Sequence, residues 1–196
     1  MKVLEISTRK GGAGVTTVAC AIALALYKKN PDRVLLVDTS ENGECFPLLG
    51  YELTSQKSPI SVGGSNLSVI SAPLPIDIDP TQYDFMIVDA GKTSVATSYL
   101  GETPLRVAVV RNAYLYLRAH THSKMPADAV VSLHHQGHAL THGDVENVLQ
   151  TYVFKYPVTD GQARSIDAGL FVSRSNLWEE WAENFIERNA LSNISV

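Results

Sequence analysis

The residues Thr8-Arg9-Lys10-Gly11-Gly12-Ala13-Gly14-Val15-Thr16-Thr17 decide the fold of this chain. They lie between a β-branched run at residues 2–7 and a long apolar run that begins at Val18. A strand, a glycine loop and a helix in this order let backbone N–H groups converge on an anion, and the helix N-terminus adds the positive end of its dipole. The stretch therefore predicts a phosphate-binding loop, with a purely structural glycine turn as the alternative.

Strand and helix patterns alternate along the rest of the chain. Short β-branched runs bounded by turn residues predict strands at residues 2–7, 33–38, 66–71, 85–89, 105–110, 129–133 and 151–155. Helical patterns occupy residues 16–29, 113–123 and 144–150, and Thr141 with Asp144 before the last one is typical of a capping box. This alternation predicts an α/β fold with a mostly parallel, twisted sheet of about seven strands and helices on both faces.

Parallel sheets bind ligands at the carboxyl ends of their strands. We therefore expect the chemistry of this protein in the loops that follow Ser7, Asp38, Asp89 and Leu133. Residues 51–66, rich in Ser, Gly and Pro, show no periodicity and predict a surface loop or a mobile switch region.

Length and composition predict one domain over residues 1–196, since 45% of the residues are apolar and the length suits one hydrophobic core. The net charge of −4 argues against a protein that coats nucleic acid or an anionic membrane by charge alone. Cys20 and Cys45 are too few for a disulfide framework, which fits a reducing compartment. No apolar run reaches the ~18 residues of a membrane span, so we expect a cytoplasmic protein without membrane insertion.

The C-terminal segment predicts an amphipathic helix. Its apolar side is formed by Leu177, Trp178, Trp181, Phe185 and Ile186. The opposite side carries four glutamates, whereas a helix lying on a membrane surface is usually rich in Lys and Arg. The pattern favours packing in the core or in a dimer.

The glycine loop resembles the deviant Walker A motif of the ParA/MinD superfamily, K-G-G-x-G-K-[ST]-T. The resemblance implies a P-loop NTPase fold that binds ATP or ADP with Mg²⁺. It also identifies Lys10 as the signature lysine, which in such proteins reaches the partner's phosphates in an ATP-dependent homodimer. The residues that would hold the nucleotide are Lys10, Gly11, Gly12, Ala13, Gly14, Val15, Thr16 and Thr17.

Val15 is the main departure from this motif, because it stands where the family has the P-loop lysine. Its side chain carries no charge to neutralise the β- and γ-phosphates. Atypical members that resemble the CpaE/TadZ and BcsQ groups also lack this lysine. The substitution is therefore compatible with nucleotide binding, while it argues against efficient hydrolysis.

Two further strands carry carboxylates that match the family. Residues 33–38 resemble the Walker A′ strand, but Ser40 replaces the second aspartate after Asp38, and a hydroxyl cannot polarise water as a carboxylate does. Residues 83–89 resemble the Walker B strand, which ends at Asp89. The resemblance implies that Thr16, Asp38 and Asp89 hold Mg²⁺ and that Lys10 and Asp38 are the candidate catalytic residues. Weak or absent hydrolysis is the expectation.

Two further residues are candidates for nucleotide contact. Lys92, three residues after Asp89, could restore some of the positive charge lost at Val15, although an exposed lysine without a partner is the common alternative. Pro157 precedes a stretch, residues 162–170, that resembles the late family segment bordering the nucleobase.

Basic residues and histidines in the second half suggest two other sites. Non-specific DNA contacts, as in ParA relatives, could come from a stripe formed by Arg111, Arg118, His120, His122 and Lys124. His134, His135 and His138 invite a metal interpretation, but Gly137 interrupts any helix and no Cys or carboxylate completes the set. We do not expect a metal there.

Four functions follow as hypotheses. The first is a ParA/MinD-like nucleotide switch for the partition or positioning of DNA or a protein complex, working as an ATP-dependent homodimer with an adaptor protein. The second is a nucleotide-independent scaffold on the same fold, which Val15 and Ser40 support; an active ParA-type DNA-partition ATPase is the opposite alternative. A metabolic kinase or ligase fits least, because the P-loop lysine is absent. Fold alone does not decide among these.

Overall fold

The computed structural model describes residues 1–29, 33–40, 43–52, 58–71, 77–92, 99, 101–123, 126–135, 137–159 and 176–189. Within these ranges the backbone forms one eight-stranded sheet in the order β3-β4-β2-β5-β1-β6-β7-β8. The strands are β1 (Lys2–Ser7), β2 (Val34–Asp38), β3 (Ile60–Ser61), β4 (Leu67–Ser71), β5 (Phe85–Asp89), β6 (Leu105–Arg111), β7 (Ala129–His135) and β8 (Val153–Val158). All neighbouring pairs are parallel except β3 with β4, so the predicted α/β class and mostly parallel sheet are confirmed.

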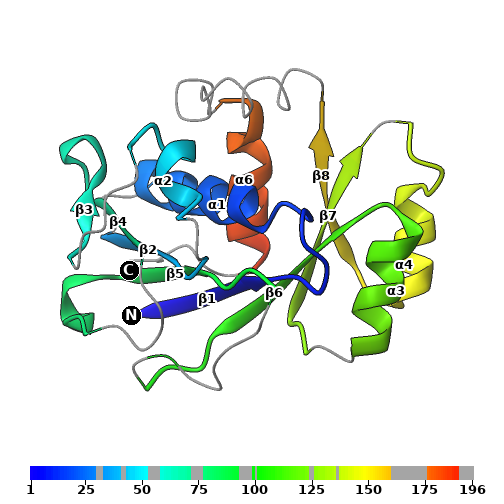
Figure 1. Ribbon diagram of the computed structural model, residues 1–196, viewed down its shortest axis with the longest axis horizontal. Helices are drawn as coiled ribbons and strands as arrows, with labels where there is room; N and C mark the ends of the chain where they lie inside the picture. The colour runs from blue at the N-terminus through cyan, green and yellow to red at the C-terminus, as the bar shows by residue number, and fades with distance from the viewer. Residues whose placement is uncertain are drawn as a thin grey trace.

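Helices cover both faces of this sheet, as predicted. The described helices are α1 (Val15–Lys29), α2 (Cys45–Leu48), α3 (Tyr114–Ser123), α4 (His142–Leu149) and α6 (Asn176–Arg188), with short 3₁₀ helices η1 (Val62–Gly64) and η2 (Pro80–Gln82). Figure 1 shows α1, α2 and α6 gathered together, apart from α3 and α4, with β7 and β8 between the two groups. The glycine loop joins the end of the central strand β1 to the start of α1, so it lies at the carboxyl ends of the parallel strands.

The main core lies under α1 and α6. Alternate residues of the strands, such as Leu4 and Ile6, point to this face, since successive strand side chains alternate between faces. From α6, Trp178 and Phe185 are fully buried there. The apolar side of the C-terminal helix therefore packs in the core, one of the two arrangements predicted; the side chain of Leu177 lies outside the described residues.

A smaller core lies on the opposite face, under α3 and α4. Leu117 of α3 and Val145 of α4 pack on it against Val110 and Val130 of the sheet. The predicted capping box is present at the start of α4: the Thr141 hydroxyl accepts a hydrogen bond from the Asp144 N–H, and the Asp144 carboxylate accepts one from the Thr141 N–H. This confirms the start of α4 and supplies two hydrogen bonds that the helix terminus would otherwise lack.

Two elements differ from the sequence prediction. All seven expected strands occur, but residues 51–66 are not a loop throughout, because they contain β3 and η1. The two-residue β3 is too short to show a period of two, and it forms only by pairing antiparallel with β4. The four-residue α2 was likewise unpredicted, being barely one turn long. Residues 53–57 of this segment lie outside the described ranges.

No helix within the described ranges is long and apolar enough to cross a membrane.

Candidate functional site

A pocket of about 660 Å³ opens where β1, β2, β5 and β6 end. Its lining comprises Thr8, Gly11, Gly12, Ala13, Gly14, Val15, Thr16, Thr17, Thr39, Ser40, Glu44, Asp89, Ala90, Gly91, Lys92 and Arg111. The strands are parallel and in register, with Asp38 paired to Asp89 across β2 and β5, so the loops after three different strands meet here. The structure thus brings the glycine loop and the Walker-like carboxylates together.

Gly14 sets the shape of the loop just before α1. Its φ of +96° lies in a region that side chains with a Cβ rarely adopt. A Cβ at this position would lie 2.3 Å from Cδ2 of Leu133, so β7 supports the loop from below. We expected the loop after Leu133 to carry chemistry; instead β7 continues to His135, and Leu133 is a buried support for the glycine loop.

Lys92 lies against the glycine loop from the turn after β5. A Cβ placed on Gly11 would be 2.6 Å from Cε and 3.2 Å from Nζ of Lys92, so the end of the lysine side chain lies directly against the glycine. No carboxylate in the described ranges forms an ion pair with this lysine. Its ammonium group is therefore positioned beside the loop and has no acidic partner there.

Val15 opens α1 and packs into the main core with 6% of its surface exposed. A lysine at this position would add a cation to the pocket, which valine cannot do. The pocket floor at this point is apolar, and its positive charge comes from other elements, Lys92 and Arg111.

The carboxylates of Asp38 and Asp89 lie side by side beneath the pocket and are both buried. Asp38 accepts hydrogen bonds from the N–H and hydroxyl of Ser40, at 2.9 and 2.6 Å, and from the N–H of Cys45 at 2.7 Å. Asp89 accepts one from the Gly91 N–H at 3.1 Å and a weaker one from the Cys45 thiol at 3.8 Å. Ser40 is thus bound to Asp38 and does not stand free beside the pocket.

These carboxylates, with the hydroxyl of Thr16, form a set of oxygen atoms suited to Mg²⁺. The pKa of Asp89 is raised to about 6, first by burial and then by the neighbouring Asp38, although the hydrogen bond from the Thr16 hydroxyl lowers it. A cation between the two carboxylates would relieve this repulsion. Burial also raises the pKa of the Cys45 thiol, which stays neutral, so the charged ligands are oxygens, as Mg²⁺ prefers.

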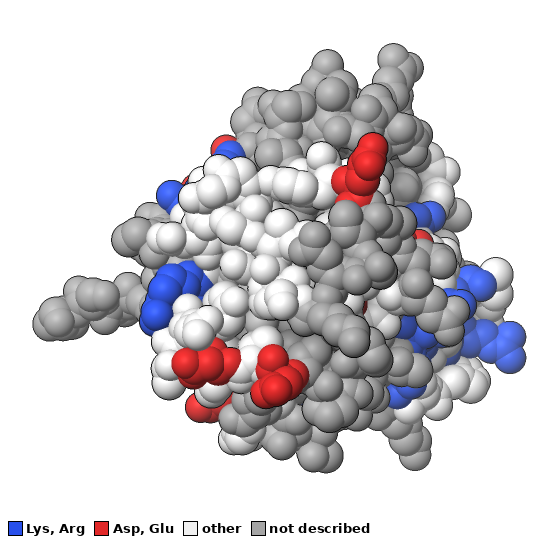
Figure 2. Space-filling model, turned by 60° about the vertical axis from the view of Figure 1, so that its left-hand side comes forward, with Lys and Arg blue, Asp and Glu red and all other residues white. Residues whose placement is uncertain are grey.

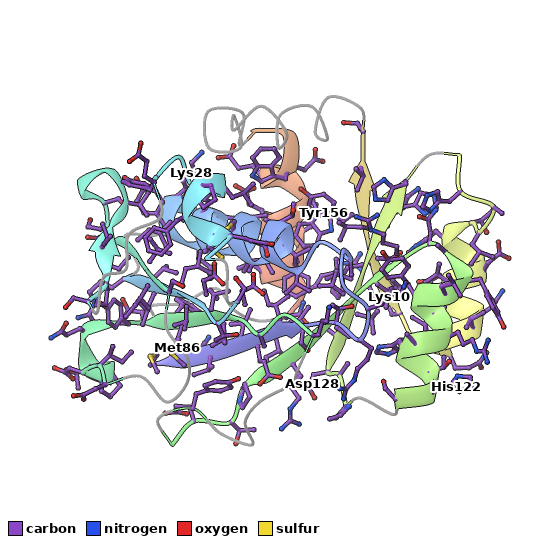
Figure 3. All side chains as sticks on the ribbon, in the orientation of Figure 1. Lys10, Lys28, Met86, His122, Asp128 and Tyr156 are labelled. Carbon is purple, nitrogen blue, oxygen red and sulfur yellow. The ribbon has the colours of Figure 1, made fainter. Side chains whose placement is uncertain are left out.

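Lys10 does not line this pocket. Its ammonium lies over the ring of Tyr116 in α3, 5.5 Å from the centroid, and Figure 3 shows it between the glycine loop and α3. It borders a neighbouring groove of about 430 Å³ with Arg9, Leu115, Arg118, Ala119 and His122. Within one chain Lys10 therefore borders this groove and does not line the phosphate pocket.

Arg111 is the site residue that the sequence did not predict as such. It was assigned to a DNA-binding stripe, yet it lines the pocket at the end of β6 while Arg118 is exposed on α3. Its place at a strand end is the signal that could have found it. Among the other predicted residues, Pro157 pairs with His134 inside β8, and Lys124 lies outside the described residues.

Comparisons with known proteins agree with this architecture. No family model matches the chain. The chromosome partitioning protein ParA of Caulobacter vibrioides is 31% identical over 120 residues, which are 61% of this chain and 43% of ParA. The matched segment thus spans less than half the length of that relative.

Two solved structures resemble the whole chain in fold. MinD of Pyrococcus horikoshii, solved with Mg-ADP, has a TM-score of 0.69 at 14% identity and covers 98% of this chain and 99% of its own. The MinC:MinD cell division complex of Aquifex aeolicus has a TM-score of 0.67 at 18% identity, with 100% and 98% covered. The chain therefore has the α/β fold of the ParA/MinD P-loop ATPases.

Proposed function

We propose that this protein is a ParA/MinD-like nucleotide switch that serves partition or intracellular positioning. The observation that carries the proposal is the pocket itself: a glycine loop at a helix N-terminus, with Thr16 and the buried Asp89 beneath it. Backbone N–H groups and the helix dipole favour the phosphates of ATP or ADP, and two buried carboxylates favour a divalent cation. MinD of Pyrococcus horikoshii, which shares the fold, was solved with Mg-ADP.

In this proposal the loop from Gly11 to Thr17 holds the phosphates, with Lys92 beside it and Pro157 bordering the base. Thr16, Asp38 and Asp89 would hold Mg²⁺, which supplies charge neutralisation when bound. The pKa of Asp89, about 6, leaves this carboxylate mostly ionised at pH 7 even before a cation binds. Residues 1–196 act as a single domain.

Hydrolysis is expected to be weak or absent. Val15 gives the β- and γ-phosphates no cation, and Ser40 cannot act as a general base. The Ser40 hydroxyl donates to Asp38, so it helps to hold the buried carboxylate in place rather than to orient a water. In lacking the P-loop lysine, the protein resembles the CpaE/TadZ group.

Lys10 is the residue proposed to turn binding into dimerisation. Its position on the outer surface beside α3 suits contact with a second copy better than contact with its own pocket. An adaptor protein is a further expected partner. Arg118, with Lys124, is the proposed contact for non-specific DNA, since Arg9, Lys10 and Arg118 border one groove.

Equilibrium binding of labelled ATP, with and without Mg²⁺, tests the switch directly. Light scattering of the same samples reports dimer formation. We expect saturable binding that Mg²⁺ strengthens, together with a doubling of mass. The absence of saturable binding would favour the alternative, a nucleotide-independent scaffold on the same fold.

A phosphate-release assay tests the catalytic part of the proposal. The wild type is expected to release phosphate at a marginal rate, and Val15→Lys serves as the variant that returns the missing cation. A wild-type rate like that of ordinary members of the superfamily would instead indicate an active DNA-partition ATPase.

A further inference from the structure

The pocket has lost the cation of the P-loop, yet it contains an arginine that no motif accounts for. Arg111 ends β6 and lines the same pocket as Gly11–Thr17 and Lys92. It is half-buried, whereas Arg118 of the same predicted stripe is exposed on α3. The two arginines therefore face different surroundings, although the sequence placed them in one stripe.

Contacts around Tyr116 fix Arg111 next to the glycine loop. The guanidinium carbon of Arg111 lies 5.6 Å from the centroid of the Tyr116 ring. The hydroxyl of Tyr116 donates a hydrogen bond of 3.2 Å to the carbonyl of Gly11. One aromatic side chain thus lies between the loop and two cations, Arg111 and Lys10, of which only Arg111 lines the pocket.

The guanidinium of Arg111 also has capacity left for an anion. Within the described ranges its buried Nε has no hydrogen-bond partner, and no carboxylate there forms an ion pair with the guanidinium. A buried donor without a partner is unfavourable, so an oxygen ligand entering the pocket would gain from it. Phosphate oxygens match the planar fork of an arginine especially well.

From this geometry we propose that Arg111 is a phosphate-binding residue of the nucleotide pocket. Together with Lys92 it takes the electrostatic role that the P-loop lysine plays where Val15 now stands. The two cations come from the ends of β5 and β6 and flank the glycine loop, so the charge reaches the phosphates from the side instead of from the loop itself. The inference rests on the proposed function, since it names how this pocket holds its anion.

Titration calorimetry with Mg-ATP and, in parallel, with inorganic tripolyphosphate tests the proposal. Arg111→Gln should weaken both ligands by about tenfold or more, because it removes charge-assisted hydrogen bonds to phosphate. Arg111→Lys keeps the charge without the planar guanidinium fork, so its affinity for both ligands should fall less than that of Arg111→Gln. Lys155→Gln removes an exposed cation of β8 outside this pocket; it is the control, and its affinity for both ligands should stay within about twofold of the wild type.

The outcomes separate this inference from the proposed function. If the wild type binds Mg-ATP, and if Arg111→Gln and Arg111→Lys bind it as tightly as the wild type does, the inference is wrong while the proposed switch is unaffected. If the wild type binds neither ATP nor tripolyphosphate, both are overturned. If Arg111→Gln lost DNA binding while its ATP affinity was unchanged, Arg111 would be a DNA contact and the inference would be wrong. Thermal melting of both glutamine variants without ligand reports folding, and Arg111→Lys decides the question if Arg111→Gln is unstable.

Discussion

Gly14 is the residue on which the geometry of the loop depends most directly. We expect Gly14→Ala to lower the free energy of unfolding by about 2–4 kcal/mol, because it adds a positive-φ penalty to an overlap with Leu133. Leu133 is 4% exposed and held in the core, so it cannot move aside freely. Urea unfolding measures the change.

Gly101→Ala is the control for this prediction. Gly101 has a similar φ of +86°, but no atom of the residues that the structure describes lies within 4 Å of the added Cβ. The free energy of unfolding of Gly101→Ala should therefore fall only by the penalty for a side chain at positive φ, about 1–2 kcal/mol. Equal losses in the two variants would show that Leu133 does not constrain the loop.

Asp89 makes the stability of the nucleotide-free protein depend on pH. Its pKa is about 6 in the folded protein, against 3.8 for an ordinary aspartate, so ionisation opposes folding. The penalty is absent below about pH 4, grows between 4 and 6, and reaches its full value of about 3 kcal/mol above pH 6. Asp89→Asn should therefore stabilise the free protein at pH 8 by about 1–3 kcal/mol and lose this advantage near pH 4.

Urea unfolding at pH 8, 6 and 4 follows this difference. Asp79→Asn is the control of opposite sign, because hydrogen bonds from the hydroxyl and N–H of Thr81 lower the pKa of Asp79. Removing that carboxylate should lower the free energy of unfolding at pH 8 rather than raise it. A gain from Asp89→Asn that does not vary with pH would contradict the assigned pKa.

Among the elements, α6 is the helix whose packing closes the main core. Phe185 is fully buried and meets the ring of Phe154 edge to face, with centroids 4.8 Å apart. We expect Phe185→Ala to lower the free energy of unfolding by about 3–5 kcal/mol, from lost burial and the cavity left behind. Glu183→Ala, on the exposed side of the same helix, should change it by no more than about 0.5 kcal/mol. Similar effects in both variants would mean that α6 is only loosely attached.

At the scale of the whole molecule, charge is distributed unevenly over the surface. On the face shown in Figure 2 the described centre is uncharged, with acidic side chains near its lower margin and Lys and Arg towards the sides. The groove that holds Lys10 is locally basic, with Arg9 and Arg118, in a chain whose net charge is −4. Contacts made by this groove should therefore depend on ionic strength.

Lys10→Ala tests whether this surface forms the proposed dimer. The variant should bind Mg-ATP within a few-fold of the wild type, because Lys10 does not line its own pocket, yet remain a monomer by light scattering with ATP. Lys155→Ala, an exposed lysine on β8, should dimerise like the wild type. Dimerisation of Lys10→Ala with unchanged affinity would contradict the role given to Lys10.

Most of the fold could be predicted, because the parallel strands are buried apolar runs with clear ends. The sequence indicated seven strands and four helices at nearly their observed positions, and Thr141 with Asp144 marked the start of α4. The short β3 and α2 could not be found this way, because two and four residues carry no period. Their formation depends on pairing with β4 and on the Cys45 N–H that donates to Asp38.

The sequence by itself determined the local chemistry of the glycine loop: its glycines, Thr16, and the absence of a lysine at Val15. These residues are neighbours in the chain, so their relation does not depend on distant contacts. Only the tertiary structure decided that Lys92 and Arg111 line the pocket of this loop while Lys10 lies over Tyr116 of α3 and borders a neighbouring groove. The reason is physical: the ends of β1, β5 and β6 meet only when the parallel sheet forms, and Tyr116 then holds Arg111 next to Gly11.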